Sequence, residues 1–168
     1  MTAITSSTLF SEPVDLVYNI LNTRTNVADP RDATGARKFI YTTEPFHKAF
    51  DFKEFPYIYL QFPNITQEQS SADGKHKMVS YTQSIVARTI RDGSGGSRVD
   101  AGVTDMKTIT DDIMETFNNE TNKKLFRASR LFSPEISLIN SDSAIIGMQS
   151  LHETEFELSY GMRFKVTT

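Results

Sequence analysis

The chain has 168 residues, the length of one domain. Its 18 lysines and arginines against 21 aspartates and glutamates give a formal charge of −3. This balance excludes a basic protein that binds nucleic acid by neutralising many phosphates. The sequence contains no cysteine, which excludes disulfides, thiol catalysis, zinc fingers and iron–sulfur clusters. An apolar fraction of 38% argues against disorder, and no apolar run is long enough to span a membrane.

The first element that the sequence predicts is a short helix over residues 12–22. Ser11, Glu12 and Pro13 suit a cap and a first helical turn, and apolar residues follow at helical spacing. Residues 1–10 are small and polar, so we expect a flexible arm. They lack the basic start and apolar stretch of a signal peptide, and we therefore expect a soluble protein made in a cytosol.

A polar segment follows, and it has two interpretations. Residues 22–37 contain no apolar periodicity, which favours a solvated loop. The alternative is an arm that becomes ordered only on a partner subunit. The segment and its border carry four basic residues: Arg24, Arg31, Arg37 and Lys38.

The middle of the chain predicts strands joined by polar loops. Residues 39–42 form a short strand candidate, and residues 55–62 carry apolar side chains on both faces, as a covered strand would. Residues 63–76 are polar and are predicted to be a flexible hairpin loop. Residues 77–91 alternate between apolar and polar and predict a long strand. The Gly/Ser-rich residues 92–102 predict a flexible connection.

The second half predicts one more clear helix and several strands. The helix begins at Thr104-Asp105 and ends at Asn118, and residues 123–132 are expected to add a helical turn that Pro134 stops. Shorter strands are expected around residues 136–138 and 145–146.

The last segment has the clearest pattern in the chain. Six apolar residues alternate with polar ones over residues 156–166, which predicts a strand with one buried and one wet face. We therefore expect residues 1–168 to form a single α+β domain, in which a mostly antiparallel sheet packs against two helices.

No pattern in the sequence predicts catalysis, a cofactor or a metal. The Gly-rich residues 92–97 lack the lysine–hydroxyl pair and the immediate helix of a phosphate loop. Asp111 and Asp112 are helix neighbours and point to different sides. The three histidines lie in separate segments without metal-binding spacing: His47, His76 and His152. We expect no enzyme.

One acidic row is a candidate functional surface. Glu153, Glu155 and Glu157 share one face of the last strand. They form either a solvated face or an acidic wall that repels nucleic acid, and Arg163 and Lys165 reverse the sign further along.

The aromatic content suggests an oligomer. Twelve phenylalanines and six tyrosines exceed what two helices and one sheet face need, so we expect copies of the chain to cover the excess apolar surface.

In this layout the chain resembles the tail terminator (tail completion) proteins of long-tailed bacteriophages. The shared features are an early helix, the strand motif Phe55-Pro56-Tyr57, a helix with Asp105, Ile109 and Ile113 at four-residue spacing, and a closing strand with Tyr160-Gly161-Met162. The resemblance covers residues 11–21 and 50–167. Residues 22–48 look like an insertion relative to shorter family members.

The resemblance implies a structural virion protein without cofactor or metal, assembled in the host cytoplasm. Such proteins form rings, expected to be hexameric, at the head-proximal end of the tail tube. The ring stops tube polymerisation and joins the tube protein to the head-completion or connector proteins. DNA passes through the lumen without specific binding, and we expect the acidic row to face that lumen.

Three other functions stay open at this point. A different neck protein, such as a head-completion or head–tail joining protein, has a similar role. A tail tube subunit has a related sheet-and-helix build. A small-ligand-binding or enzymatic α+β domain is the alternative of a different class, and it requires a concave apolar pocket with convergent polar groups.

Overall fold

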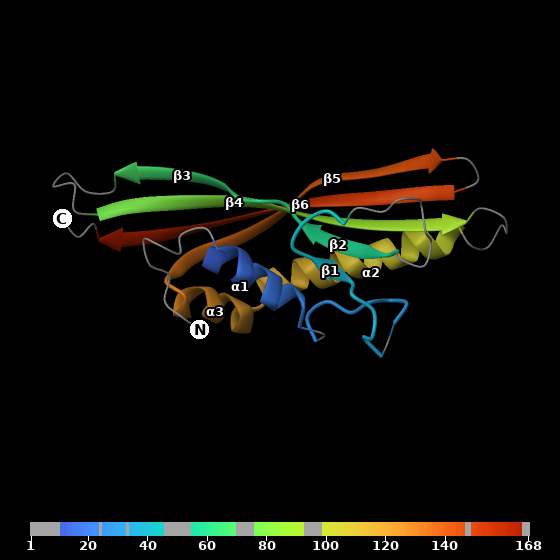
Figure 1. Cartoon of the computed structure of the whole chain (residues 1–168), viewed down its shortest axis with the longest axis horizontal. Helices are drawn as coiled ribbons and strands as arrows, with labels where there is room; N and C mark the ends of the chain where they lie inside the picture. Colours follow the sequence, from blue (N-terminus) through green and yellow to red (C-terminus); the bar gives the residue numbers. More distant parts are fainter. Residues whose placement is uncertain are drawn as a thin grey trace.

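A computed structural model of the chain describes residues 11–23, 25–32, 34–45, 55–69, 76–92, 99–146 and 149–165. Across these ranges it shows one six-stranded sheet and three helices, arranged as an elongated two-layer domain (Figure 1). The elements are α1 (Ser11–Leu21), β1 (Ile40–Tyr41), β2 (Tyr57–Leu60), β3 (Asn64–Gln69), β4 (His76–Asp92), α2 (Val99–Asn118), α3 (Glu120–Ala128), β5 (Leu131–Ile146) and β6 (Gln149–Lys165). The predicted α+β class is confirmed.

Two long strands form the centre of the sheet. Strands β4 and β6 pair antiparallel along their whole length, from His76 opposite Lys165 to Asp92 opposite Gln149. The strand order is β1-β2-β4-β6-β5, and β3 pairs with the first part of β4 on the same edge as β2. The pairing of β1 with β2 is parallel, and all other pairings are antiparallel.

All three helices lie on one face of the sheet and bury the main core (Figure 1). Amphipathic α1 and α2 place residues such as Val17, Ile109 and Ile113 against the sheet without exposure to solvent. The predicted alternation of the last strand is confirmed, because Phe156 and Leu158 are fully buried on this face.

The opposite face of the sheet carries a second, smaller core. Phe55, Tyr57, Tyr59, Val86 and Ile90 are buried there and pack together. This core accounts for much of the aromatic surplus, since both sheet faces need large side chains. The inference of an oligomer from aromatic content alone is therefore not supported, although Phe62 is 64% exposed.

Several predicted boundaries were wrong. The expected loop 63–76 contains β3, and α2 begins at Val99, inside the expected connection 92–102. A third helix, α3, is separate from α2 because Asn119 caps it by accepting a hydrogen bond from the Thr121 amide. Residues 1–10, 70–75 and 93–98, on which other expectations rested, lie outside the described residues.

Strand β5 also differs from the prediction. It is one long strand rather than two short ones, and Pro134 lies within it instead of ending a helix. Register shifts interrupt its pairing with β6 near Pro134 and again at Ile139. Arg130, between α3 and β5, has a positive φ angle of 64°, and Ser133, at the first register shift of β5, has one of 51°.

The described part of the polar segment after α1 is held by its own domain. The Arg31 guanidinium donates to the carbonyl oxygens of Phe55 (2.8 Å) and Ile90 (2.9 Å) and pairs with Asp105 (3.3 Å). Arg37 pairs with Asp29 and donates to the Pro56 carbonyl at 2.9 Å. The segment is thus neither a simple solvated loop nor an arm that needs a partner for its order.

Loss of the Arg31 guanidinium should destabilise the domain. We expect Arg31→Met, which keeps the aliphatic stem, to lower the free energy of unfolding by about 1–3 kcal/mol, because two carbonyls lose their donor. Urea denaturation followed by circular dichroism measures this change. The matched control is Lys124→Met, at an exposed position on α3, and it should change stability little. Equal stability of the two variants would contradict the anchoring role.

Candidate interaction site at the sheet edges

No catalytic or metal-binding set is found among the described residues. No group of three or more histidine, aspartate or glutamate side chains in these residues is arranged to hold a metal ion. His76 lies on β4 and His152 on β6, and His47 falls outside the described residues. Asp111 and Asp112 point apart as expected: Asp112 accepts a hydrogen bond from the Ala28 amide (3.4 Å), whereas Asp111 lines a surface hollow.

The predicted acidic row lies on the sheet face opposite the helices. Glu153, Glu155 and Glu157 alternate with the buried Thr154, Phe156 and Leu158, and each of the three glutamates is half-buried. Because β6 lies between β4 and β5, the row runs along the middle of the face rather than along an edge.

The row is not uniformly acidic, because Arg88 forms an ion pair with its first member. The Arg88 guanidinium forms ion pairs with Glu153 and Glu44 and lies over the Tyr59 ring. Burial alone would lower the pKa of Arg88, but hydrogen bonds to Tyr57, Glu153 and Glu44 outweigh it and raise the pKa. Arg88 is shared between Glu153 and Glu44 and offsets only part of their charge, so Glu155 and Glu157 are the two members of the row that Arg88 does not pair with.

The sheet edges carry the exposed apolar side chains. The outer edge of β5 has no paired strand within the described ranges, and its Leu138, Ile139 and Ile145 are 49%, 52% and 82% exposed. At the opposite edge, Phe62 and Ile65 are 64% and 40% exposed. Large apolar residues exposed at unpaired strands are a common mark of an interaction surface.

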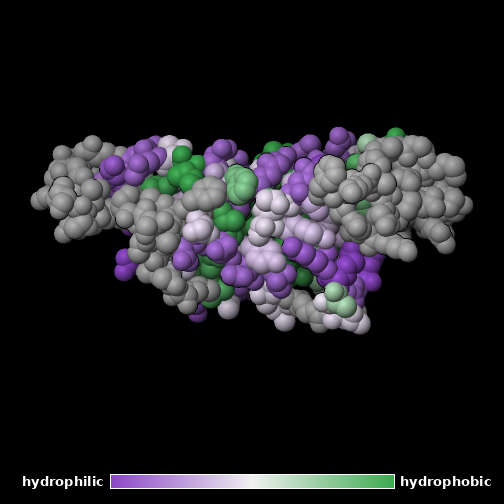
Figure 2. All heavy atoms as spheres, in the orientation of Figure 1, coloured by the Kyte–Doolittle hydropathy of each residue, from purple (hydrophilic) through white to green (hydrophobic). Residues whose placement is uncertain are grey.

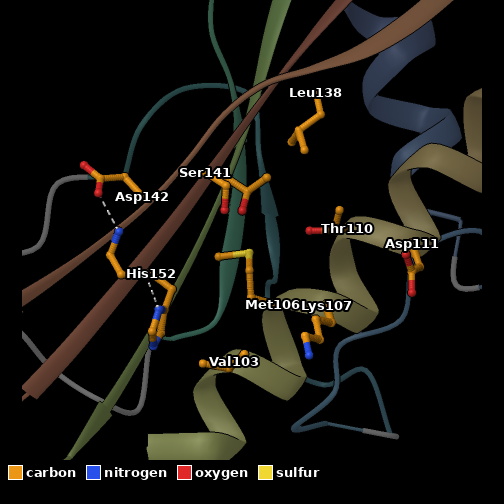
Figure 3. Close-up of a pocket in the computed structure, with 11 residues that line it drawn as sticks. Val103, Met106, Lys107, Thr110, Asp111, Leu138, Ser141, Asp142 and His152 are labelled. Atoms are coloured by element: carbon orange, nitrogen blue, oxygen red, sulfur yellow. Dashed lines mark hydrogen bonds between the residues drawn. The ribbon is translucent and has the colours of Figure 1, made fainter.

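A hollow of about 430 Å³ lies beneath β5, between this strand, β6 and the first half of α2 (Figure 3). It exists because α2 packs beneath β4 and β6 and leaves the underside of β5 partly uncovered. Leu138 stands opposite the fully buried Phe156 yet remains half exposed. The lining residues are Val103, Met106, Lys107, Thr110, Asp111, Leu138, Ser141, Asp142, Ser143, His152 and Thr154.

His152 in this hollow is not part of a catalytic triad. Its Nδ1 lies 2.7 Å from the Ser143 hydroxyl, and its buried Nε2 has no hydrogen-bond partner among the described residues. The neighbouring Asp142 accepts a hydrogen bond from the Ser143 amide (2.7 Å) instead of orienting the imidazole. Burial lowers the pKa of His152, so the side chain is neutral at pH 7.

Sequence reasoning missed both edges and the hollow. The adjacent apolar residues Leu138 and Ile139 break the alternation of β5, and this irregularity was the available signal. In the space-filling view, hydrophobic atoms form separate patches between hydrophilic ones, so the exposed apolar residues are local features (Figure 2).

No helix in the described ranges is long and apolar enough to cross a membrane. Comparison of the sequence with protein-family models and with curated proteins finds no match.

The lowered pKa of His152 predicts a pH dependence of stability. The unfolded chain binds this proton more tightly than the native protein, with an ordinary pKa of 6.5. The stabilising contribution is complete above pH 6.5 and is lost as the pH falls through the lowered pKa. We expect His152→Gln to flatten the decline of the urea midpoint between about pH 7 and pH 5. Thr108→Ala, at an exposed position on α2, should keep the original decline. An unchanged slope in His152→Gln would show that the native pKa is not lowered.

Proposed function

We propose that the chain is a structural subunit of a viral tail, which assembles into a ring at the head-proximal end of the tail tube. The observation that carries the proposal is the open sheet, whose two opposite edges both expose large apolar side chains. Such a molecule offers two different surfaces. One lies on β5, and the other lies on β3 and the residues just before it, which include Phe62. The layout resemblance to tail terminator proteins agrees with this architecture.

Two unlike surfaces on one chain favour head-to-tail association. A heterologous contact of this kind closes into a ring when the rotation per subunit divides a full turn. Ring closure also consumes the unpaired edge of β5, which otherwise templates uncontrolled strand pairing. The expected ring is hexameric, in line with the resemblance.

The layering of the domain gives the ring wall two distinct faces. All helices cover one side of the sheet, and Glu155 and Glu157 lie on the other (Figure 1). With the sheet edges in contact, one of these faces lines the lumen. We assign the glutamate face to the lumen, because negative charge repels passing DNA. The helical layer then faces outward, and the ends of the ring contact the tube protein and the head connector.

Lysines on the β5 edge should weaken assembly. We expect Ile139→Lys/Ile145→Lys to weaken ring formation at least tenfold, roughly 1.4 kcal/mol, because two charges replace apolar contacts at the interface. Light scattering over a concentration series and negative-stain imaging measure the ring.

The matched control for this experiment adds the same charge elsewhere. Thr108→Lys/Ala128→Lys alters exposed positions on α2 and α3 and should leave assembly unchanged. Rings of the wild-type chain that bind the ends of tail tubes would support the terminator role, and binding to head connectors alone would support another neck role. A wild-type chain that stays monomeric at high concentration and with tubes would refute the proposal.

Charge reversal on the glutamate face should make the ring retain DNA. We expect Glu155→Lys/Glu157→Lys to raise the affinity of the ring for double-stranded DNA several-fold, with a steep loss at higher salt. Glu153 is left unchanged because it pairs with Arg88. The control Asp15→Lys/Glu115→Lys makes the same charge change on the helices, at exposed positions. Fluorescence anisotropy with a short duplex compares the two, and equal affinities would remove Glu155 and Glu157 from the lumen.

A further inference from the structure

We infer that the hollow beneath β5 is the socket for the β3 edge of a second copy of this chain, with Ile65 as the inserted side chain and Phe62 at the end of the contact. The inference rests on the proposed ring and specifies its interface. The hollow and the exposed residues lie at opposite edges of one sheet, as a head-to-tail contact requires.

The strand directions agree with a sheet that continues across the contact. Strand β3 is antiparallel to β4, β4 to β6, and β6 to β5. A second copy in the same orientation therefore brings its β3 beside β5 in the antiparallel sense, the commoner kind of pairing. Side chains keep their faces when a sheet continues in this way.

The apolar residues of the two edges lie on matching faces. Ile65 pairs with Tyr81, and Leu138 pairs with Phe156, so both point to the helix-covered side of the sheet. Setting Ile65 of the second copy opposite Leu138 covers the open side of the hollow. Leu138, 49% exposed in the single chain, then becomes buried.

The spacing along both edges fits the same register. Phe62 precedes Ile65 by three residues, and Ser141 follows Leu138 by three residues. The shift in pairing at Ile139 lets both Leu138 and Ser141 line the hollow. An antiparallel register with Ile65 opposite Leu138 therefore sets Phe62 opposite Ser141.

The segment that carries Phe62 is held in position before any contact forms. The Gln61 amide donates to the Ser84 carbonyl (2.9 Å), and the buried Gln83 side chain donates to the Gln61 carbonyl (3.2 Å). The next residue, Pro63, is buried and has a restricted backbone. A side chain presented from a fixed backbone loses less conformational entropy on binding.

The polar groups of the two edges are also compatible. Asp111 and Asp142 border the hollow, and the stretch Asn64–Gln67 of the other edge carries no charge. Gln67, on the same face of β3 as Ile65, brings an uncharged amide to this side of the contact.

One pair of like charges opposes this register. With Ile65 opposite Leu138, Glu68 stands opposite Glu135, and directly opposed like charges are destabilising. The register therefore predicts that Glu68→Lys tightens assembly, whereas a contact elsewhere on the chain gives no such gain. The expected change is a lower dissociation concentration of the ring, by a factor of about two to five.

Cysteine pairing tests the contact directly, because the chain contains no cysteine. Side chains directly opposite in an antiparallel pair lie close enough for a disulfide. We expect Ile65→Cys and Leu138→Cys, mixed as two single variants and oxidised, to form a covalent dimer. The double variant should form a ladder of linked subunits. The control mixture of Ile65→Cys with Thr108→Cys should stay unlinked.

The outcomes separate this inference from the proposed ring. Rings that form without the Ile65–Leu138 link, and that Glu68→Lys does not tighten, would overturn the inference and keep the ring. A dimer from Ile65→Cys alone would also overturn it, because it shows a symmetric contact. Absence of both rings and links at high protein concentration would refute the inference and the proposed function together.

Discussion

The pairing of β4 with β6 is the constraint on which the rest of the structure depends. Each strand has 17 residues, roughly 56 Å when extended. Strand β4 is so long that β2 and β3 share its free edge one after the other, and β5 follows β6 on the other side. The three helices cover only part of this length, which leaves a hollow beneath β5.

Buried polar groups in the middle of this ladder link the core to the β3 edge. The Tyr160 hydroxyl donates to Gln83 (3.2 Å), and Gln83 in turn holds the Gln61 carbonyl between β2 and β3. Burial raises the pKa of Tyr160, so the hydroxyl keeps its proton. Every polar atom in this chain of contacts has a partner, and the backbone before Phe62 is therefore fixed from within the fold.

The sequence signal was strong where one face of a strand is buried and the other is wet. Residues 156–162 alternate, because Phe156, Leu158 and Tyr160 pack beneath the helices. Strand β3 escaped prediction because both its faces are largely exposed, and only Ile65 is apolar. Strand β5 was predicted as two short strands because much of it is also exposed on both faces. The hollow was beyond sequence reasoning, since it depends on the strand order and on the position of α2 relative to Leu138.

The irregularities that made β5 difficult to predict also limit which strands can pair with it. Pro134 cannot donate a backbone hydrogen bond, and the shift at Ile139 distorts the edge, so a neighbouring strand cannot pair along the whole of β5. Indiscriminate strand addition is thereby discouraged. A contact that succeeds must supply side chains for the hollow as well as backbone hydrogen bonds. The β5 edge therefore pairs poorly with most strands but can accept one strand edge whose side chains fit the hollow. This selectivity favours a closed assembly of identical subunits over an open aggregate.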